Sequence, residues 1–73
     1  MIEARLFATF RQGREKVYYF PAEEYKTVGE LLRKLDIPEK DVAILLINGF
    51  HSKPDAALKD GDIVSFFPPV AGG

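Results

Sequence analysis

A single short helical pattern lies in the middle of this chain, with strand patterns on both sides of it. Its apolar residues recur at spacings of three, four and seven, which places them on one face of a helix: Val28, Leu31, Leu32 and Leu35. Thr27 and Glu30 match a capping box at the start of this segment, and Pro38 closes it. The sequence therefore predicts one helix over about residues 28–35.

Strand patterns fill most of the remaining chain. Apolar and polar residues alternate over residues 2–10, and β-forming residues dominate residues 16–20. Residues 42–47 are a continuous apolar run, which predicts a strand buried on both faces. An Asn-Gly turn and a short strand over residues 50–53 follow, and residues 63–67 form the last predicted strand.

The order of these segments predicts an α+β fold. A hairpin followed by a helix and further strands is typical of a mixed sheet of four to five strands with one main helix packed across one face. We expect the first and last strands to be neighbours in the centre of this sheet. The apolar patterns predict one core between sheet and helix: Phe10, Leu31, Leu35, Leu45, Val64 and Phe66.

The composition excludes several kinds of chemistry. A chain of 73 residues is one domain, and a hydrophobic fraction of 47% is enough for one core. The chain has no cysteine, which excludes disulfides, thiolate metal sites and cysteine nucleophiles. His51 is the only histidine, so neither a histidine-based metal cluster nor a Ser/His/Asp triad can be assembled.

Charge and hydropathy narrow the class of protein further. The 10 basic and 11 acidic residues are well mixed, which argues against a nucleic-acid surface or a polybasic membrane anchor. No apolar run approaches the length of a membrane helix, and no signal peptide is visible. We therefore expect a cytoplasmic protein that is a monomer when free.

The sequence ends in a run that is extended at its start and slender at its end: Phe66-Phe67-Pro68-Pro69-Val70-Ala71-Gly72-Gly73. The two prolines lack an N–H donor and fix φ, so they end sheet pairing and favour an extended exit. The two final glycines have no side chains, so their backbone can enter a narrow channel. We expect a folded domain over residues 1–67 and a flexible tail over residues 68–73. Glycine pairs also occur in inert, frayed termini, and this alternative stays open.

Five segments of the chain together resemble one family: Leu6-Phe7-Ala8-Thr9-Phe10-Arg11, Thr27-Val28-Gly29-Glu30-Leu31-Leu32, Ile47-Asn48-Gly49, Leu58-Lys59-Asp60-Gly61-Asp62 and the terminal run. With the order of elements, they resemble the sulfur-carrier branch of the ubiquitin-like β-grasp fold, above all the small subunit of molybdopterin synthase (MoaD type). The thiamine sulfur carrier (ThiS type) shares the turn and the terminal glycines but typically lacks the double proline. The chain is shorter around its helix than many molybdopterin-synthase subunits, which leaves a carrier for another pathway open.

This resemblance implies a chemical role for Gly73. In that family a ubiquitin-activating-like enzyme uses ATP to adenylate the terminal glycine carboxylate, which then becomes a thiocarboxylate. The rest of the tail would lie in a partner's active site during sulfur delivery: Pro68, Pro69, Val70, Ala71 and Gly72. The implied partners are the adenylating enzyme and the large subunit of molybdopterin synthase or another sulfur acceptor enzyme. The chain itself would be a carrier and co-substrate without a bound cofactor.

Four apolar residues are set apart from the expected core: Phe7, Leu46, Ile63 and Phe67. Their alternation with core residues predicts that they face outward, on the sheet face opposite the helix and next to the base of the tail. A contiguous apolar patch in this position favours a partner surface. A small domain also spreads some apolar side chains over its surface, and this alternative stays open.

The remaining candidates favour other interpretations. His51 has no evident partner and is expected on the surface. Asp60 and Asp62 flank a glycine and fall short of a calcium loop, so they predict a turn and no metal site. A protein modifier that is joined to lysines through Gly73 would use the same tail as a sulfur carrier. A β-grasp interaction module with an inert tail would not.

Overall fold

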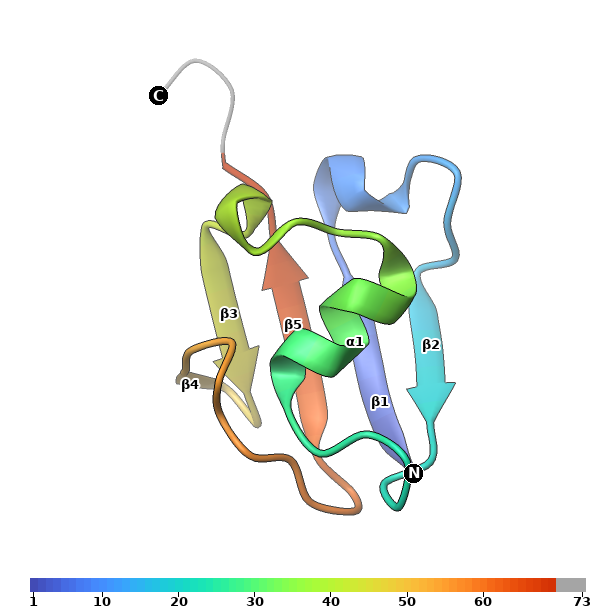
Figure 1. Ribbon diagram of the computed structural model, residues 1–73. Helices are drawn as coiled ribbons and strands as arrows, with labels where there is room; N and C mark the ends of the chain where they lie inside the picture. The colour runs from blue at the N-terminus through green and yellow to red at the C-terminus, as the bar shows by residue number, and fades with distance from the viewer. Residues whose placement is uncertain (70–73) are drawn as a thin grey trace.

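Five strands form one mixed sheet in the computed structural model, which describes residues 1–69 (Figure 1). The strand order is β2-β1-β5-β3-β4, and β1 (Ile2–Leu6) and β5 (Ile63–Phe67) are parallel neighbours in the centre. The helix α1 (Val28–Leu35) crosses one face of the sheet. The predicted α+β fold with one helix, and the predicted pairing of the first and last strands, are confirmed.

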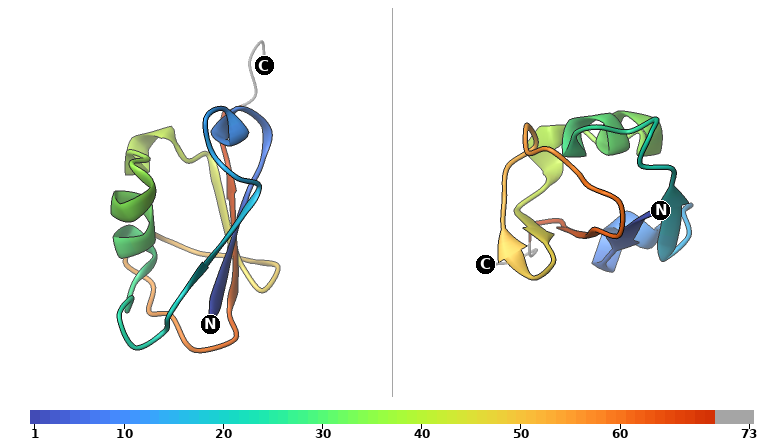
Figure 2. Two further views of the ribbon diagram at one scale, coloured as in Figure 1. Left: turned by 90° about the vertical axis from the view of Figure 1, so that its right-hand side faces the viewer. Right: turned by 90° about the horizontal axis from the view of Figure 1, so that it is seen from below.

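The other strands extend the sheet on both sides of this central pair. β2 (Val17–Phe20) is antiparallel to β1, and β3 (Ile44–Ile47) is antiparallel to β5. Asn48 and Gly49 both have positive φ, 53° and 86°, and connect β3 to β4 (Phe50–His51). Seen edge-on in Figure 2, α1 lies on one side of the sheet only. The opposite face is therefore left to outward-pointing side chains.

The helix begins and ends where the sequence predicts. The carboxylate of Glu30 accepts hydrogen bonds from the Lys26 N–H at 3.1 Å and from the Thr27 hydroxyl at 3.2 Å. The predicted pair is thus used in an altered form, because the Thr27 hydroxyl donates to Glu30 rather than accepting from a backbone N–H. At the other end, Asp36 adopts φ 60° and stops the helix.

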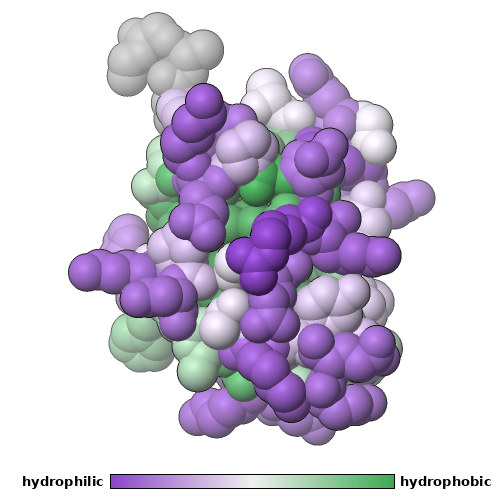
Figure 3. All heavy atoms as spheres, in the orientation of Figure 1, coloured by the Kyte–Doolittle hydropathy of each residue, from purple (hydrophilic) through white to green (hydrophobic). Residues whose placement is uncertain are grey.

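The core lies between α1 and the sheet. All six residues predicted for it are buried, with none more than 8% exposed. Leu58 is buried as well and fixes the loop that leads back to β5. On the helix side the surface of the molecule is mainly hydrophilic (Figure 3). No helix within residues 1–69 is both long and apolar enough to cross a membrane.

The predicted first strand over residues 2–10 is too long. β1 ends at Leu6, and a 3-10 helix, η1 (Ala8–Arg11), follows it. Ala8 has φ 54°, and the Phe10 N–H donates to the Phe7 carbonyl at 3.2 Å. The spacing of four between Leu6 and Phe10 fits either an alternating strand or a tight helical turn, so both residues are buried in either case.

The predicted strand over residues 42–47 is wrong in its start and in its burial. β3 begins at Ile44, and the side chain of Ile44 is 42% exposed. An apolar run predicts burial on both faces only where both faces are covered, and here α1 covers one. The short strand predicted over residues 50–53 is confirmed in position but covers two residues only, and the 3-10 helix η2 (Glu39–Asp41) was not predicted.

Candidate functional site

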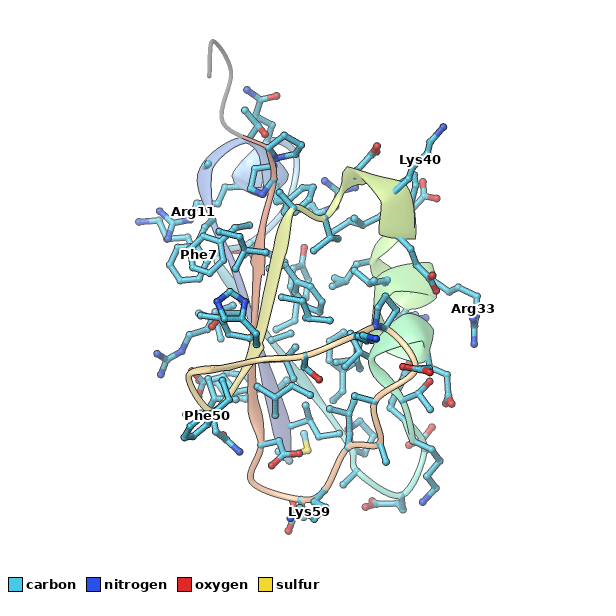
Figure 4. The ribbon with its side chains drawn as sticks, turned by 90° about the vertical axis from the view of Figure 1, so that its left-hand side faces the viewer. Phe7, Arg11, Arg33, Lys40, Phe50 and Lys59 are labelled. Carbon is cyan, nitrogen blue, oxygen red and sulfur yellow. The ribbon has the colours of Figure 1, made fainter. Side chains whose placement is uncertain are left out.

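Two aromatic rings stack at the point where the tail leaves the sheet. The ring centroids of Phe7 and Phe67 are 4.3 Å apart and the ring planes differ by 10°. Phe7 directly follows β1 and Phe67 ends β5, and the Phe7 N–H donates to the Phe66 carbonyl at 3.2 Å. Each ring is half-buried, because it covers a face of the other. Figure 4 shows Phe7 on the side of the sheet away from α1.

Arg11 extends this stack, and the sequence did not indicate its part in it. Its guanidinium carbon lies 5.3 Å from the centroid of the Phe7 ring, within the range of a cation–π contact. Its Nε donates to the Leu6 carbonyl at 2.8 Å. The 3-10 helix η1 makes both contacts possible, because it turns the chain back over Phe7 (Figure 4). We call Phe7, Phe67 and Arg11 the aromatic corner.

Two predicted patch residues lie at different distances from this corner. Leu46 is half-buried and pairs with Ser65, two residues before Phe67 on β5. Ile63 is also half-buried, but it begins β5 and pairs with Glu3. Ile63 lies four positions before Phe67 on β5, a separation of about 13 Å. The predicted set of four is therefore split, with Leu46 near the corner and Ile63 at the far end of the sheet.

Ile44 is an apolar residue of this outer face that was not predicted to lie there. It pairs directly with Phe67 across β3 and β5, and it is exposed. The signal was available, because Ile44 lies two residues before Leu46 and must share its face of the sheet. His51 pairs with Leu46 at the next strand and is exposed, as predicted. We call Phe7, Phe67, Ile44 and Leu46 the outer patch.

The last residue of β5, where the tail starts, is held by the residue that precedes β3. The Phe67 carbonyl accepts a hydrogen bond from the Ala43 N–H at 2.8 Å. Pro68 is half-buried and Pro69 is exposed. The other predicted tail residues, Val70, Ala71, Gly72 and Gly73, lie outside the described residues.

The turn before β5 has a structural role, as predicted. Asp62 is buried, and its carboxylate accepts hydrogen bonds from the Asn48 side-chain amide at 3.0 Å and from the Lys59 N–H at 2.8 Å. The Met1 ammonium forms an ion pair with Asp60 and thereby lowers the pKa of Asp60. This end of the molecule is opposite the C-terminal end of β5 (Figure 1). Within residues 1–69 no group of metal-binding side chains gathers.

A cavity of about 550 Å³ lies at the start of α1, away from the outer patch. Its lining includes the backbone of Gly29 and the exposed side chains of Arg33 and Lys53. The first N–H groups of the helix are already used there, because Val28 donates to the Ala56 carbonyl and Gly29 to the Pro54 carbonyl. They are not free to bind an anion, so the aromatic corner with the outer patch is the stronger candidate site.

Comparison with known proteins agrees with this geometry. The ThiS family matches residues 4–73. Small archaeal modifier protein 3 of Haloferax volcanii is 37% identical, in a gapped alignment of 91 residues that covers 99% of this chain and 98% of the relative.

Two solved structures share the fold over nearly their whole length. The crystal structure of SAMP1 from Haloferax volcanii superposes with a TM-score of 0.74 and 25% identity, covering 99% of this chain and 98% of the other. A chain in the complex of subunits 1 and 2 of molybdopterin-converting factor from Helicobacter pylori gives 0.67 and 27%, covering 99% and 97%. The chain therefore belongs to the ThiS family, among the ubiquitin-like sulfur carriers and modifiers.

Proposed function

We propose that this protein carries sulfur as a thiocarboxylate at Gly73. The observation that carries the proposal is the outer patch: an apolar surface that includes two stacked rings lies at the base of a tail that ends in two glycines. Family membership supports the same role. The chain has no cysteine, so any sulfur that it carries must be attached to another group.

The proposed chemistry needs a partner for each step. A carboxylate oxygen of Gly73 attacks the α-phosphorus of ATP, and pyrophosphate leaves. A sulfur nucleophile such as hydrosulfide then attacks the carbonyl carbon and forms a carbon–sulfur bond, and the carbon–oxygen bond to AMP breaks, so that AMP leaves with the oxygen and the electron pair. No electrons are gained or lost in either step. The resulting thioacid is ionised at neutral pH and is nucleophilic without a thiol side chain. The catalytic groups belong to the adenylating enzyme, so the chain is a co-substrate.

The outer patch is the proposed docking surface for these enzymes. Apolar anchors beside a reactive tail let a partner bind the folded domain firmly while the tail enters its active site. The relative from Helicobacter pylori was solved in a complex with a second subunit, which supports a protein partner for this fold. The same face would serve both the adenylating enzyme and the sulfur acceptor.

We propose molybdopterin synthesis as the pathway, with the large subunit of molybdopterin synthase as the acceptor. The double proline in the terminal run supports this choice over a thiamine-type carrier. Subunit 1 of a molybdopterin-converting factor is a structural relative in both Helicobacter pylori and Pyrococcus furiosus.

Protein modification is the second candidate, and the 37% identity to a small archaeal modifier protein favours it. Both functions share the acyl adenylate. They differ in the next nucleophile, which is sulfur for a carrier and a lysine amine for a modifier. The amine would form an isopeptide bond to Gly73.

Mass spectrometry of the intact chain separates these functions. The chain is incubated with an adenylating enzyme of this family, MgATP and sulfide, and α,β-methylene ATP replaces ATP in the control. A carrier gains the mass difference between sulfur and oxygen, in the ATP sample only. An unchanged mass would favour an inert tail. Isopeptide-linked products in a cell extract, without sulfur gain, would favour the modifier.

A further inference from the structure

The direction in which the tail leaves the fold depends on very few torsions. Pro68 has its φ fixed by its ring, and it restricts Phe67 to extended conformations. The hydrogen bond from the Ala43 N–H holds the Phe67 carbonyl, and therefore the peptide plane that enters Pro68. The ring of Phe67 is held by its stack on Phe7. Any tilt of Phe67 is therefore passed on to Pro68.

Phe7 alone is a weak support for Phe67, because it lies just outside β1. The residue after it, Ala8, has φ 54° and belongs to a single 3-10 turn. Arg11 stabilises this turn through two contacts. Its Nε bonds to the Leu6 carbonyl at 2.8 Å, and its guanidinium lies over the Phe7 ring at 5.3 Å. The side chain thus joins the end of β1 to the ring that supports Phe67.

We propose that Arg11 is a positioning residue: it holds Phe7 flat on Phe67 and thereby sets the direction in which the chain leaves β5 at Pro68. This inference rests on the proposed function, since direction matters only if Gly73 must reach a partner's active site. Chemistry at a bound group is sensitive to placement, and an error of about 1 Å costs up to about 100-fold in rate. We therefore expect Arg11 to affect the rate of adenylation within the bound complex more than the affinity of the chain for the adenylating enzyme.

The kinetic test uses Arg11→Gln, Arg11→Lys and, as a control on the helix side, Arg33→Gln. Single-turnover adenylation is measured against the concentration of the enzyme, which separates the maximal rate from the half-saturating concentration. We expect Arg11→Gln to lower the maximal rate about 3- to 10-fold, because it loses a cation–π contact and a charged hydrogen bond. The half-saturating concentration should change less than about two-fold. Arg11→Lys keeps a cation and should fall between.

A double-mutant cycle shows whether Arg11 acts through Phe7. In a Phe7→Leu background the ring is gone, so Arg11→Gln should have little further effect on the maximal rate. An undiminished effect in that background would overturn the proposal. A higher half-saturating concentration for Arg11→Gln, with an unchanged maximal rate, would also overturn the proposal. Arg11 would then be a direct contact for a carboxylate of the enzyme.

A measurement on the isolated protein separates this inference from the proposed function. Stacking shifts the ring protons of Phe67 in the NMR spectrum, and Arg11→Gln should move them toward the values of an unstacked ring, while Arg33→Gln leaves them unchanged. Unchanged Phe67 signals in folded Arg11→Gln would overturn the positioning role. If the wild-type chain is never adenylated, the proposed function fails, and the ring shifts still decide whether Arg11 holds the stack.

Discussion

Arg14 joins two segments that lie more than 20 residues apart in the chain. Its guanidinium donates to the Leu35 carbonyl at 3.1 Å and to the Asp36 carbonyl at 3.1 Å, at the end of α1. It also reaches the Phe10 carbonyl of η1 at 3.4 Å. The last carbonyls of a helix lack partners within the helix, and a cation there also suits the helix dipole. One side chain therefore fastens the turn after β1 to the end of the helix.

Arg14→Ala should lower the free energy of unfolding by about 1–3 kcal/mol, because charged hydrogen bonds to carbonyls are lost. Arg14→Lys should restore part of this, since it keeps the charge but not the fork of donors. Lys40→Ala, a change of an exposed cation in η2, is the control and should stay within about 0.5 kcal/mol of wild type. Equal urea midpoints for Arg14→Ala and Lys40→Ala would refute the role of Arg14.

The two rings of the outer patch are expected to act in partner binding rather than in stability. Phe67→Ala and Phe7→Ala should each weaken binding to the adenylating enzyme by about 2 kcal/mol or more, the range of an interface hot spot. The domain should stay folded, because both rings lie outside the main core. Tyr19→Ala, an exposed aromatic residue on the edge strand β2, serves as the control. Calorimetric titration together with circular dichroism measures both effects. Wild-type affinity in a folded Phe67→Ala chain would remove the patch from the interface.

Two residues whose roles the sequence did not indicate share a physical reason. Arg11 and Arg14 are polar residues in a segment with turn composition, and their roles depend on acceptors five and 21 residues away in the sequence. No local pattern announces such contacts. Ile44 differs, because its face follows from Leu46 by simple alternation. Its exposure was not predicted, because a continuous apolar run over residues 42–47 indicates burial on both faces.

At the scale of elements, local signals decided which boundaries could be predicted. α1 has a cap residue, an apolar stripe and a left-handed stop, and its predicted range is confirmed. β5 is bounded by a glycine turn and a double proline, and its range is confirmed as well. β1 has no such stop. It ends at Leu6, shortly before Ala8 takes a positive φ, and alanine rarely adopts that conformation, so its presence gives no signal of the stop.

The packing of α1 on the sheet predicts a large loss of stability for one truncation. Leu31 is fully buried in the stripe that faces the sheet. Leu31→Ala should therefore lower the free energy of unfolding by about 2–5 kcal/mol. Lys34→Ala, on the exposed side of the same helix, should change it by less than about 0.5 kcal/mol. Chemical denaturation measures both, and an unchanged midpoint for Leu31→Ala would place the helix in the wrong rotation.

The whole molecule is organised so that the tail leaves from its best-supported strand. β5 lies in the centre of the described sheet, where it is paired to β1 on one side and to β3 on the other. The turn that begins β5 is anchored by Asp62 at one end of the sheet, and the aromatic corner holds its other end. A force applied to the tail by a partner is therefore borne by the central strand and its core contacts, and not by an edge strand.

This arrangement predicts that the tail can be changed without loss of stability. Deletion of Gly73, or addition of one residue after it, should leave the unfolding midpoint unchanged, because the core lies within residues 2–66. Binding through the outer patch should survive in both variants. Sulfur transfer should be lost, because one residue moves the reacting carbon by roughly 3.5 Å, and catalytic geometry tolerates about 0.5 Å.

Gly72→Ala tests the channel itself, since it keeps the length of the tail and adds one methyl group. A site built around bare backbone should clash with that methyl group, so we expect intermediate or no sulfur transfer with unchanged affinity. The experiment pairs a single-turnover sulfur-transfer assay with a binding isotherm for each variant. Bound but unproductive complexes are the expected outcome for the two changes of length, and bound complexes with reduced or no transfer are expected for Gly72→Ala. Full activity from the chain that lacks Gly73 would falsify the carrier function, because the carboxylate of that residue is the proposed site of adenylation.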